Sequence, residues 1–306
     1  MDPIKVIYVL GYGHSGSTIL TVLLGHHAQA FGTGELTRLV RAWNEERYCS
    51  CGETVPQCAT WTKVIEHWRD HSSVDPLEVY PALQRECERS VGVWPARGAR
   101  KNFDQYSELT RNLMVAMAET TGQRVIVDSS KLTSRSIALA NVPGIDLNVV
   151  HLVRDGRGVA WSMRRPLKPA EAAPGPGKSG PVEDTMRPAS RTSLAWTLNN
   201  LVSEAVCRRV RADGTIRVRY EDLVNDVGAT LQRIGKVVGL DYADVIRQVE
   251  GGEPFEPGHV VAGNRLRMKG PIRLKMDTEW QSKMPNGQRK IASLICGPLL
   301  RRYGYF

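Results

Sequence analysis

The stretch IKVIYVLGYGHSGSTILTVLL, Ile4 to Leu24, decides the fold. Its first part, Ile4 to Leu10, is apolar and rich in β-branched residues, as expected of a buried strand. A glycine-rich turn follows, and an apolar helical pattern begins at Ser17. A buried strand that passes through such a turn into a helix is typical of a parallel α/β sheet.

The rest of the chain repeats this alternation. Three further runs have a strand's character: RVIVD from Arg124, DLNVVHLV from Asp146 and TIRVRY from Thr215. Helical patterns lie between the strands, at Ser17–His27, Tyr106–Thr121, Ser134–Ala140, Gly156–Arg165, Arg191–Arg211 and Asp222–Gly239. We therefore expect an α/β fold with a mostly parallel sheet, helices on both faces, and ligands at the carboxyl ends of the strands.

Composition and charge limit the classes of function. The chain has 306 residues, 42% of them hydrophobic, which is enough for a single domain over 1–306 with an insertion at about 41–100 and a Pro/Gly-rich loop at about 166–188. Its net charge of +9 suits an anionic partner. The basic residues are spread along the chain, which disfavours nucleic acid as that partner.

No segment resembles a signal peptide or a membrane helix, so we expect no membrane insertion and a cytoplasmic location.

The turn after the first strand has the features of a phosphate-binding loop. Gly11, Gly16, Ser17 and Thr18 fit the P-loop pattern G-x-x-x-x-G-K-[ST], except that Ser17 replaces the lysine. Backbone N–H groups and the positive end of the following helix favour a phosphate there, and the hydroxyls of Ser15, Ser17 and Thr18 add donors. Without the lysine that reaches the β- and γ-phosphates, the loop favours a nucleotide with a single 5′-phosphate. A glycine-rich turn without a ligand is the alternative.

A second segment, VVHLVRDGRGVAWSMRR, can supply another phosphate pocket. Its buried strand ends at Arg154, and Ser162 lies on the following helix, so both can face the carboxyl end of the sheet. A guanidinium forms paired, charged hydrogen bonds with phosphate. Alone, Arg154 could instead form a strand-end salt bridge with Asp155.

Together these segments resemble the PAPS-dependent sulfotransferase family, whose donor is 3′-phosphoadenosine-5′-phosphosulfate (PAPS) and whose product is adenosine 3′,5′-bisphosphate (PAP). In that family a basic residue followed by Ser-Gly-[ST]-Thr binds the 5′-phosphosulfate. The run His14-Ser15-Gly16-Ser17-Thr18, preceded by Gly13, corresponds to it here. His14 stands where the family usually has Lys or Arg, and a histidine is cationic only part of the time near neutrality.

The resemblance implies further cofactor contacts. It assigns the 3′-phosphate to Arg154 and Ser162, with Arg157 as a helper. The segment GNRLRMKGPIRL, Gly263 to Leu274, is similar to the family's C-terminal loop that closes over the cofactor, which makes Arg265 and Arg267 candidates for phosphate contacts, along with Lys269.

The resemblance also implies catalytic groups. In members with a similar loop, a Glu in a Gly-Glu pair just past the first helix is often the base, and FGTGELTRL places Glu35 there. Glu35 could instead simply begin the next helix, where acids are favoured. The same resemblance assigns Lys131 in VIVDSSK to neutralising the sulfuryl or bridging oxygen. Asp128 of that segment can also be interpreted as a Walker-B acid that holds Mg²⁺.

These observations give one leading function and two others. The leading hypothesis is a sulfotransferase that moves the sulfuryl group from PAPS to a hydroxyl of a small-molecule, glycan or lipid acceptor by in-line displacement, without a metal. A P-loop kinase is the runner-up because of Asp128, and a non-catalytic nucleotide-binding domain is the third.

Cysteines and tryptophans gather in the insertion. Cys49, Cys51 and Cys58 have the spacing C-x-C-x6-C, which lacks the paired C-x-x-C of common zinc fingers. A fourth zinc ligand would have to come from His67, His71 or Cys87, so we favour free thiols without a metal, and a zinc site is the alternative. Four tryptophans could line an apolar acceptor pocket or belong to the core: Trp43, Trp61, Trp68 and Trp94.

Overall fold

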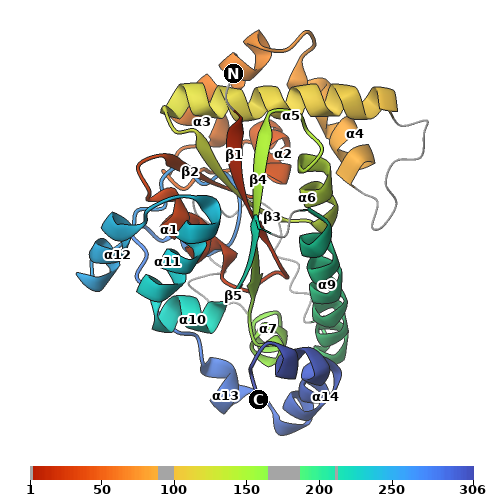
Figure 1. The fold of residues 1–306 in the computed structure, drawn as a ribbon, viewed down its shortest axis with the longest axis vertical. Helices are drawn as coiled ribbons and strands as arrows, with labels where there is room; N and C mark the ends of the chain where they lie inside the picture. The colour runs from red at the N-terminus through yellow and green to blue at the C-terminus, as the bar shows by residue number, and fades with distance from the viewer. Residues whose placement is uncertain (1–2, 89–99, 165–186, 211–212) are drawn as a thin grey trace.

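The computed structural model describes residues 3–88, 100–164, 187–210 and 213–306. Five strands form one parallel sheet in the order β2-β3-β1-β4-β5. Their bounds are Ile4–Leu10 (β1), Ala30–Gly34 (β2), Val125–Lys131 (β3), Ile145–Val153 (β4) and Thr215–Arg219 (β5). The predicted α/β fold is confirmed, with helices on both faces of the sheet (Figure 1).

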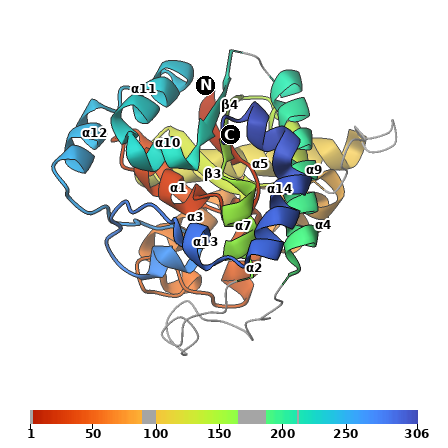
Figure 2. The same cartoon turned by 90° about the horizontal axis from the view of Figure 1, so that it is seen from below.

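The central strand β1 shows why both faces are covered. Its side chains alternate, as the two-residue period of a strand requires. Val6 and Tyr8 belong to one buried cluster, and Ile7 and Val9 to another. Contacts with the first face come from α5 (Arg100–Thr121), α6 (Thr133–Leu139) and α9 (Ala189–Val210), and with the second from α1 (Ser17–Gly25) and α11 (Val227–Val238). Figure 2 shows α1 and α11 on one side and α9 on the other.

Strand β2 is the element that the sequence prediction missed. Its sequence, AFGTG, is short and contains two glycines, which are depleted in strands. It forms because Thr33 Oγ1 donates to the carbonyl of Val127 at 2.8 Å and because Gly34 adopts φ 83°, where a Cβ would meet the carbonyl oxygen of Ala262. This edge strand carries the chain to Glu35 at the carboxyl end of the sheet.

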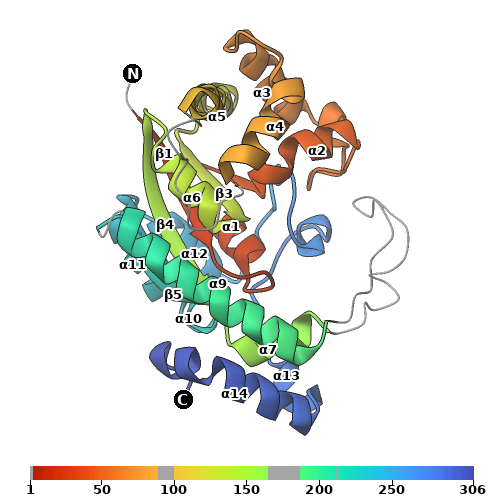
Figure 3. The ribbon, with the colours of Figure 1, turned by 90° about the vertical axis from the view of Figure 1, so that its right-hand side faces the viewer.

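The insertion is helical where it is described. It contains α2 (Leu39–Asn44), α3 (Ala59–Asp70) and α4 (Pro76–Glu88), and α3 and α4 pack against α5 (Figure 3). Trp61 and Trp68 are fully buried in the main core, and Trp43 packs against it. These side chains are therefore structural. Trp94 and almost all of the loop at about 166–188 lie outside the described residues.

Five further helices lie C-terminal to β4 in the described part of the chain. They are α7 (Gly156–Ser162), α10 (Tyr220–Asn225), α12 (Ala243–Glu250), α13 (Glu279–Lys283) and α14 (Asn286–Arg302), with 3-10 turns at Leu36–Arg38, Val55–Gln57 and Arg265–Met268. Helix α14 packs against α7 and α9. In the described part of the chain, every helix is too short or too polar to cross a membrane.

Candidate active site

The phosphate loop requires its glycines. It joins β1 to α1, and Gly16 caps the helix with φ 92°. A Cβ at Gly11 would lie 2.2 Å from the carbonyl oxygen of Leu152, and one at Gly16 would lie 2.5 Å from the ring of Tyr220. The loop is therefore held tightly against β4 and α10, with the first turn of α1 opening on a cavity.

That cavity has a volume of about 720 Å³, within the usual range for small-molecule and cofactor sites. Because parallel strands end at one edge of the sheet, it collects residues that are distant in sequence. All the predicted site residues except Ser15 line it: Gly13, His14, Gly16, Ser17, Thr18, Glu35, Lys131, Arg154, Ser162, Arg265 and Arg267. Ser15 is buried, and its hydroxyl has no hydrogen-bond partner within the described structure.

The cavity is strongly basic. Two carboxylates, those of Glu35 and Asp277, face nine Lys and Arg side chains: Arg38, Arg41, Arg47, Lys131, Arg154, Arg265, Arg267, Lys269 and Lys275. Such a lining attracts a ligand with several negative charges. The sequence analysis assigned no role to Arg38, which lies in the segment FGTGELTRL. It missed Arg41, Arg47, Lys275 and Asp277 because none of the motifs includes them.

The two predicted phosphate pockets are adjacent. Arg154 Nη1 donates to the carbonyl oxygen of His14 at 3.0 Å, and the Nδ1 atom of His14 lies 2.9 Å from Ser162 Oγ. Arg154 also pairs with Asp277 at 3.0 Å and lies over the ring of Tyr220. His14, at φ 63°, thus joins the phosphate loop to the strand-end pocket.

Asp155 pairs with Arg157 and not with Arg154, so Arg154 remains at the cavity. Its carboxylate pairs with Arg157 at 2.6 Å and caps α7 through the Arg157 backbone N–H. The alternative strand-end salt bridge between Arg154 and Asp155 is therefore not formed. Arg157, in turn, lies over the ring of Trp280 and is not among the residues that line the cavity.

A second group of charged side chains, Glu35, Lys131 and Arg38, lies near Ser17, where the phosphate loop ends and α1 begins. Lys131 Nζ donates to Glu35 Oε1 at 2.6 Å and lies 3.4 Å from Ser17 Oγ, and Arg38 Nε donates to Glu35 Oε2 at 2.6 Å. Burial alone would raise the pKa of Glu35, but Lys131 and Arg38 outweigh it and lower the pKa. Glu35 directly precedes the 3-10 turn Leu36–Arg38, and its side chain makes no capping bond there.

Asp128 has a structural role. Its carboxylate is fully buried and accepts a hydrogen bond from Arg135 Nε at 2.8 Å and another from the backbone N–H of Ser130 at 2.9 Å. Arg135 also pairs with the buried Glu88. Asp128 is not among the residues that line the cavity, and its charge is compensated by a guanidinium, which is contrary to a Walker-B role.

The C-terminal segment closes on the phosphate loop. The backbone N–H of Asn264 donates to Thr18 Oγ1 at 3.2 Å, which brings the following 3-10 turn to the cavity. Arg267 is buried and donates to the carbonyl oxygen of Val260 at 3.1 Å, and its Nε atom has no partner within the described structure. Arg267 nevertheless lines the cavity.

These features place a basic cavity at the carboxyl ends of a parallel α/β sheet, lined by a glycine-rich loop, Arg154 and the Glu35–Lys131 pair. Residues 6–244 match the sequence model described as the sulfotransferase family. The chain belongs to the sulfotransferase family, a class of transferases that use PAPS. No curated protein sequence matches the chain.

Solved structures agree with this fold. The sulfotransferase domain from the Synechococcus PCC 7002 olefin synthase is 18% identical, with a TM-score of 0.50 over 97% of this chain and 95% of that domain. The sulfotransferase domain from the curacin biosynthetic pathway is 14% identical, with a TM-score of 0.50 over 98% of both chains. Sulfotransferase STF9 from Mycobacterium avium is 11% identical, with a TM-score of 0.52 over 99% of this chain and 78% of its own. At such identities the likeness shows the fold alone.

Proposed function

We propose that the cavity binds PAPS and that the enzyme transfers its sulfuryl group, by in-line displacement, to a hydroxyl of a small-molecule, glycan or lipid acceptor. PAPS, when bound, supplies the sulfuryl group and leaves as PAP. The observation that carries this proposal is the pairing of Glu35 with Lys131 beside Ser17, at the start of the phosphate-loop helix. A potential base and a cation thus adjoin the loop that suits a 5′-phosphosulfate.

The residues of the cavity fit such a donor. The first turn of α1 offers Ser17 and Thr18, and Arg154 with Ser162 forms a second anion pocket linked to the first through His14. Arg267, whose Nε atom has no hydrogen-bond partner in the described structure, also lines the cavity and could pair with a bound anion after a small side-chain movement. Two anion pockets within one cavity suit a nucleotide that is charged at both ends.

Glu35 is the proposed base. Its lowered pKa keeps the carboxylate ionised near neutrality, so it can accept the proton of an acceptor hydroxyl as that oxygen bonds to sulfur. Lys131 holds this carboxylate, and its ammonium is close enough to the start of α1 to stabilise charge on the transferred group or the leaving oxygen.

His14 is proposed to assist the leaving group. It occupies the loop position between Gly13 and Ser15, its ring contacts Ser162, and its carbonyl oxygen accepts from Arg154. A protonated imidazole there would add one positive charge near the 5′-phosphate.

The alternative of a P-loop kinase is not favoured, because Ser17 replaces the P-loop lysine and Asp128 is neutralised by Arg135. The test incubates the purified protein with labelled PAPS and a panel of alcohols, phenols, sugars and lipid headgroups, with and without added Mg²⁺, and with labelled ATP in parallel. Label transfer from PAPS without Mg²⁺ is expected. Mg²⁺-dependent transfer from ATP would support the kinase, and PAP binding without transfer to any acceptor would support a binding domain.

A further inference from the structure

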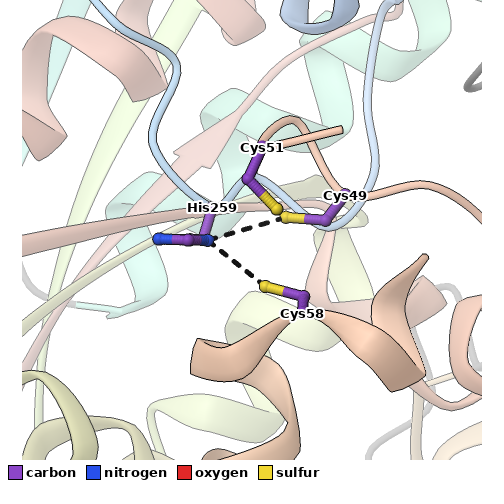
Figure 4. A group of neighbouring side chains, drawn as sticks. All are labelled: Cys49, Cys51, Cys58 and His259. Atoms are coloured by element: carbon purple, nitrogen blue, oxygen red, sulfur yellow. Dashed lines mark hydrogen bonds between the residues drawn. The ribbon is translucent and has the colours of Figure 1, made fainter. Parts of the chain in front are cut away.

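Three cysteines of the insertion meet one histidine from the C-terminal part of the chain, and none of the four lines the cavity (Figure 4). Cys49 and Cys51 lie in a tight loop, Cys58 is the N-cap of α3, and His259 comes from a segment 201 residues beyond Cys58. Their ligand atoms all lie within 4.8 Å of one another. His259 Nδ1 is 3.2 Å from Cys58 Sγ and 4.0 Å from Cys49 Sγ.

We propose that Cys49, Cys51, Cys58 and His259 bind a structural Zn²⁺ ion. Zn–S bonds of about 2.3 Å and Zn–N bonds of about 2.0–2.1 Å, arranged tetrahedrally, separate neighbouring ligand atoms by about 3.5–3.8 Å. The two nitrogen–sulfur distances fall on either side of this range, so small side-chain rotations complete the site. Three thiolates and an imidazole fill the tetrahedron, which is typical of a structural zinc site rather than a catalytic one.

The backbone around the ligands is fixed by its own hydrogen bonds. Gly52, at φ 98°, allows the loop to fold back, with its N–H donating to the carbonyl of Cys49 at 3.1 Å and the Cys49 N–H donating to Glu53 at 2.8 Å. Trp61 Nε1 donates to the carbonyl of His259 at 2.8 Å. Such outer contacts orient metal ligands before the ion binds.

Electrostatics at two ligand positions also suit a metal–thiolate centre. Cys58 sits at the positive end of the 12-residue helix α3, which favours a thiolate there. A Zn²⁺ ion with three thiolates carries a net negative charge, and the buried Arg267, which bonds to the carbonyl of Val260 next to His259, lies near enough to interact with Cys49 and Cys51.

The fourth ligand differs from those considered from the sequence. His67 bonds to Thr120, His71 pairs with Glu119, and Cys87 is near the carbonyl of Asn102. The residue that completes the cluster, His259, is remote in sequence and follows no spacing motif. For this reason the cysteine spacing alone argued against zinc.

The metal would tie the insertion to the segment that closes the active site. Ser50 bonds to both Gly258 and Val260, and beyond His259 the chain reaches Ala262, whose carbonyl accepts from the Glu35 N–H at 3.1 Å. Two residues later, Asn264 donates to Thr18. By holding His259, the metal would order this segment where it borders the cavity proposed to bind PAP. That consequence rests on the proposed function, whereas the metal site itself does not.

The test measures zinc in the purified full-length protein by mass spectrometry of the elements. We expect about one zinc ion per chain. Cys58→Ser and His259→Ala should lose it, and Cys87→Ser, a cysteine of the same insertion outside the cluster, should retain it. Absence of zinc from the unmodified protein, or zinc retained by both ligand variants, would overturn the proposal.

A second measurement does not depend on how the variants fold. Titration of the native protein with a mercurial thiol reagent should release zinc, detected with a chromogenic chelator, as the cluster thiols react. Removal of the ion should lower the unfolding temperature of the protein whether or not it has transferase activity. An intact mass lower by two hydrogens, which indicates a disulfide within the cluster, would contradict the zinc site.

Discussion

The ammonium of Lys131 donates to the carboxylate of Glu35 across 2.6 Å, joining the ends of two neighbouring strands that are 96 residues apart in the chain. Both side chains are mostly buried, with 18% and 16% of their surface exposed. Lys131 therefore needs Glu35 as a charge partner, because an unpaired ion would be costly there, whereas Glu35 also pairs with Arg38. The pairing also means that Glu35, the proposed base, is ionised before an acceptor arrives.

Glu35→Gln should lower kcat by about 10²–10⁴-fold, because an amide cannot accept the proton of the acceptor hydroxyl. Binding of PAP should be nearly intact, since the amide keeps the shape of the side chain. Turnover with labelled PAPS and calorimetric titration with PAP measure the two effects. Glu119→Gln, at a carboxylate that pairs with His71 and does not line the cavity, serves as the control. Unchanged turnover in Glu35→Gln would remove Glu35 from the mechanism.

The acid side of the pH profile should report the environment of Glu35. Because the pKa of this carboxyl is lowered from 4.5, the rate should hold as pH falls to that value and should be lost only below it, as the carboxylate takes up a proton. Arg38→Gln removes one of the cations that lower the pKa, so the loss should begin at higher pH. Profiles of kcat/KM for both proteins provide the check, and coincident acid limbs would show that another group titrates.

Arg154→Ala should weaken PAP far more than the analogue without the 3′-phosphate. Charged hydrogen bonds of about 1.5–3 kcal/mol correspond to a loss of about tenfold to more than a hundredfold. The comparison of the two nucleotides separates this effect from any loosening of the loop, since Arg154 also supports the carbonyl of His14. Equal losses for both nucleotides would be inconsistent with a 3′-phosphate pocket at Arg154.

Asp277→Asn should bind PAP more tightly than the unmodified protein. The carboxylate of Asp277 pairs with Arg154 at 3.0 Å and lines the same cavity as the proposed 3′-phosphate pocket. Without this negative charge, the Arg154 guanidinium can pair with the phosphate alone, and the repulsion between the carboxylate and the phosphate is removed. The gain in affinity for PAP should be smaller at high salt, which screens both interactions. Calorimetric titration at two ionic strengths measures it. Weaker binding would show that Asp277 supports the pocket rather than competing for it.

The sequence predicted the parts of the fold that strong local patterns determine. The apolar strand from Ile4 and the glycines at 11 and 16 require a strand, a tight turn and a helix, and this unit was confirmed. The strand Ala30–Gly34 was missed because its stability comes from pairing with β3 and from Ala262, not from its own residues. Tertiary contacts outweighed local propensity there.

The site shows the same division. Residues at strand ends, such as Lys131 and Arg154, could be placed in one cavity because a parallel sheet brings its carboxyl ends together. Arg47, Asp277 and His259 could not, because they reach their positions through long connections without a motif. His259, the fourth proposed zinc ligand, lies 201 residues beyond Cys58. The spacing of the three cysteines therefore could not indicate it.

His14→Lys should change the alkaline side of the pH profile. If His14 assists the leaving group as a cation, the rate of the unmodified enzyme should fall as pH rises and the imidazolium loses its proton, within about pH 5–8. A lysine keeps its charge to about pH 10, so the variant should retain its rate over this interval. Substitution also removes the contact of the ring with Ser162, so the absolute rate of the variant can be lower while its profile is flatter.

The shape of log kcat against pH is therefore the decisive quantity. Parallel profiles for the two proteins would mean that the loop acts through its backbone N–H groups and hydroxyls, with His14 serving only to join it to Arg154 and Ser162.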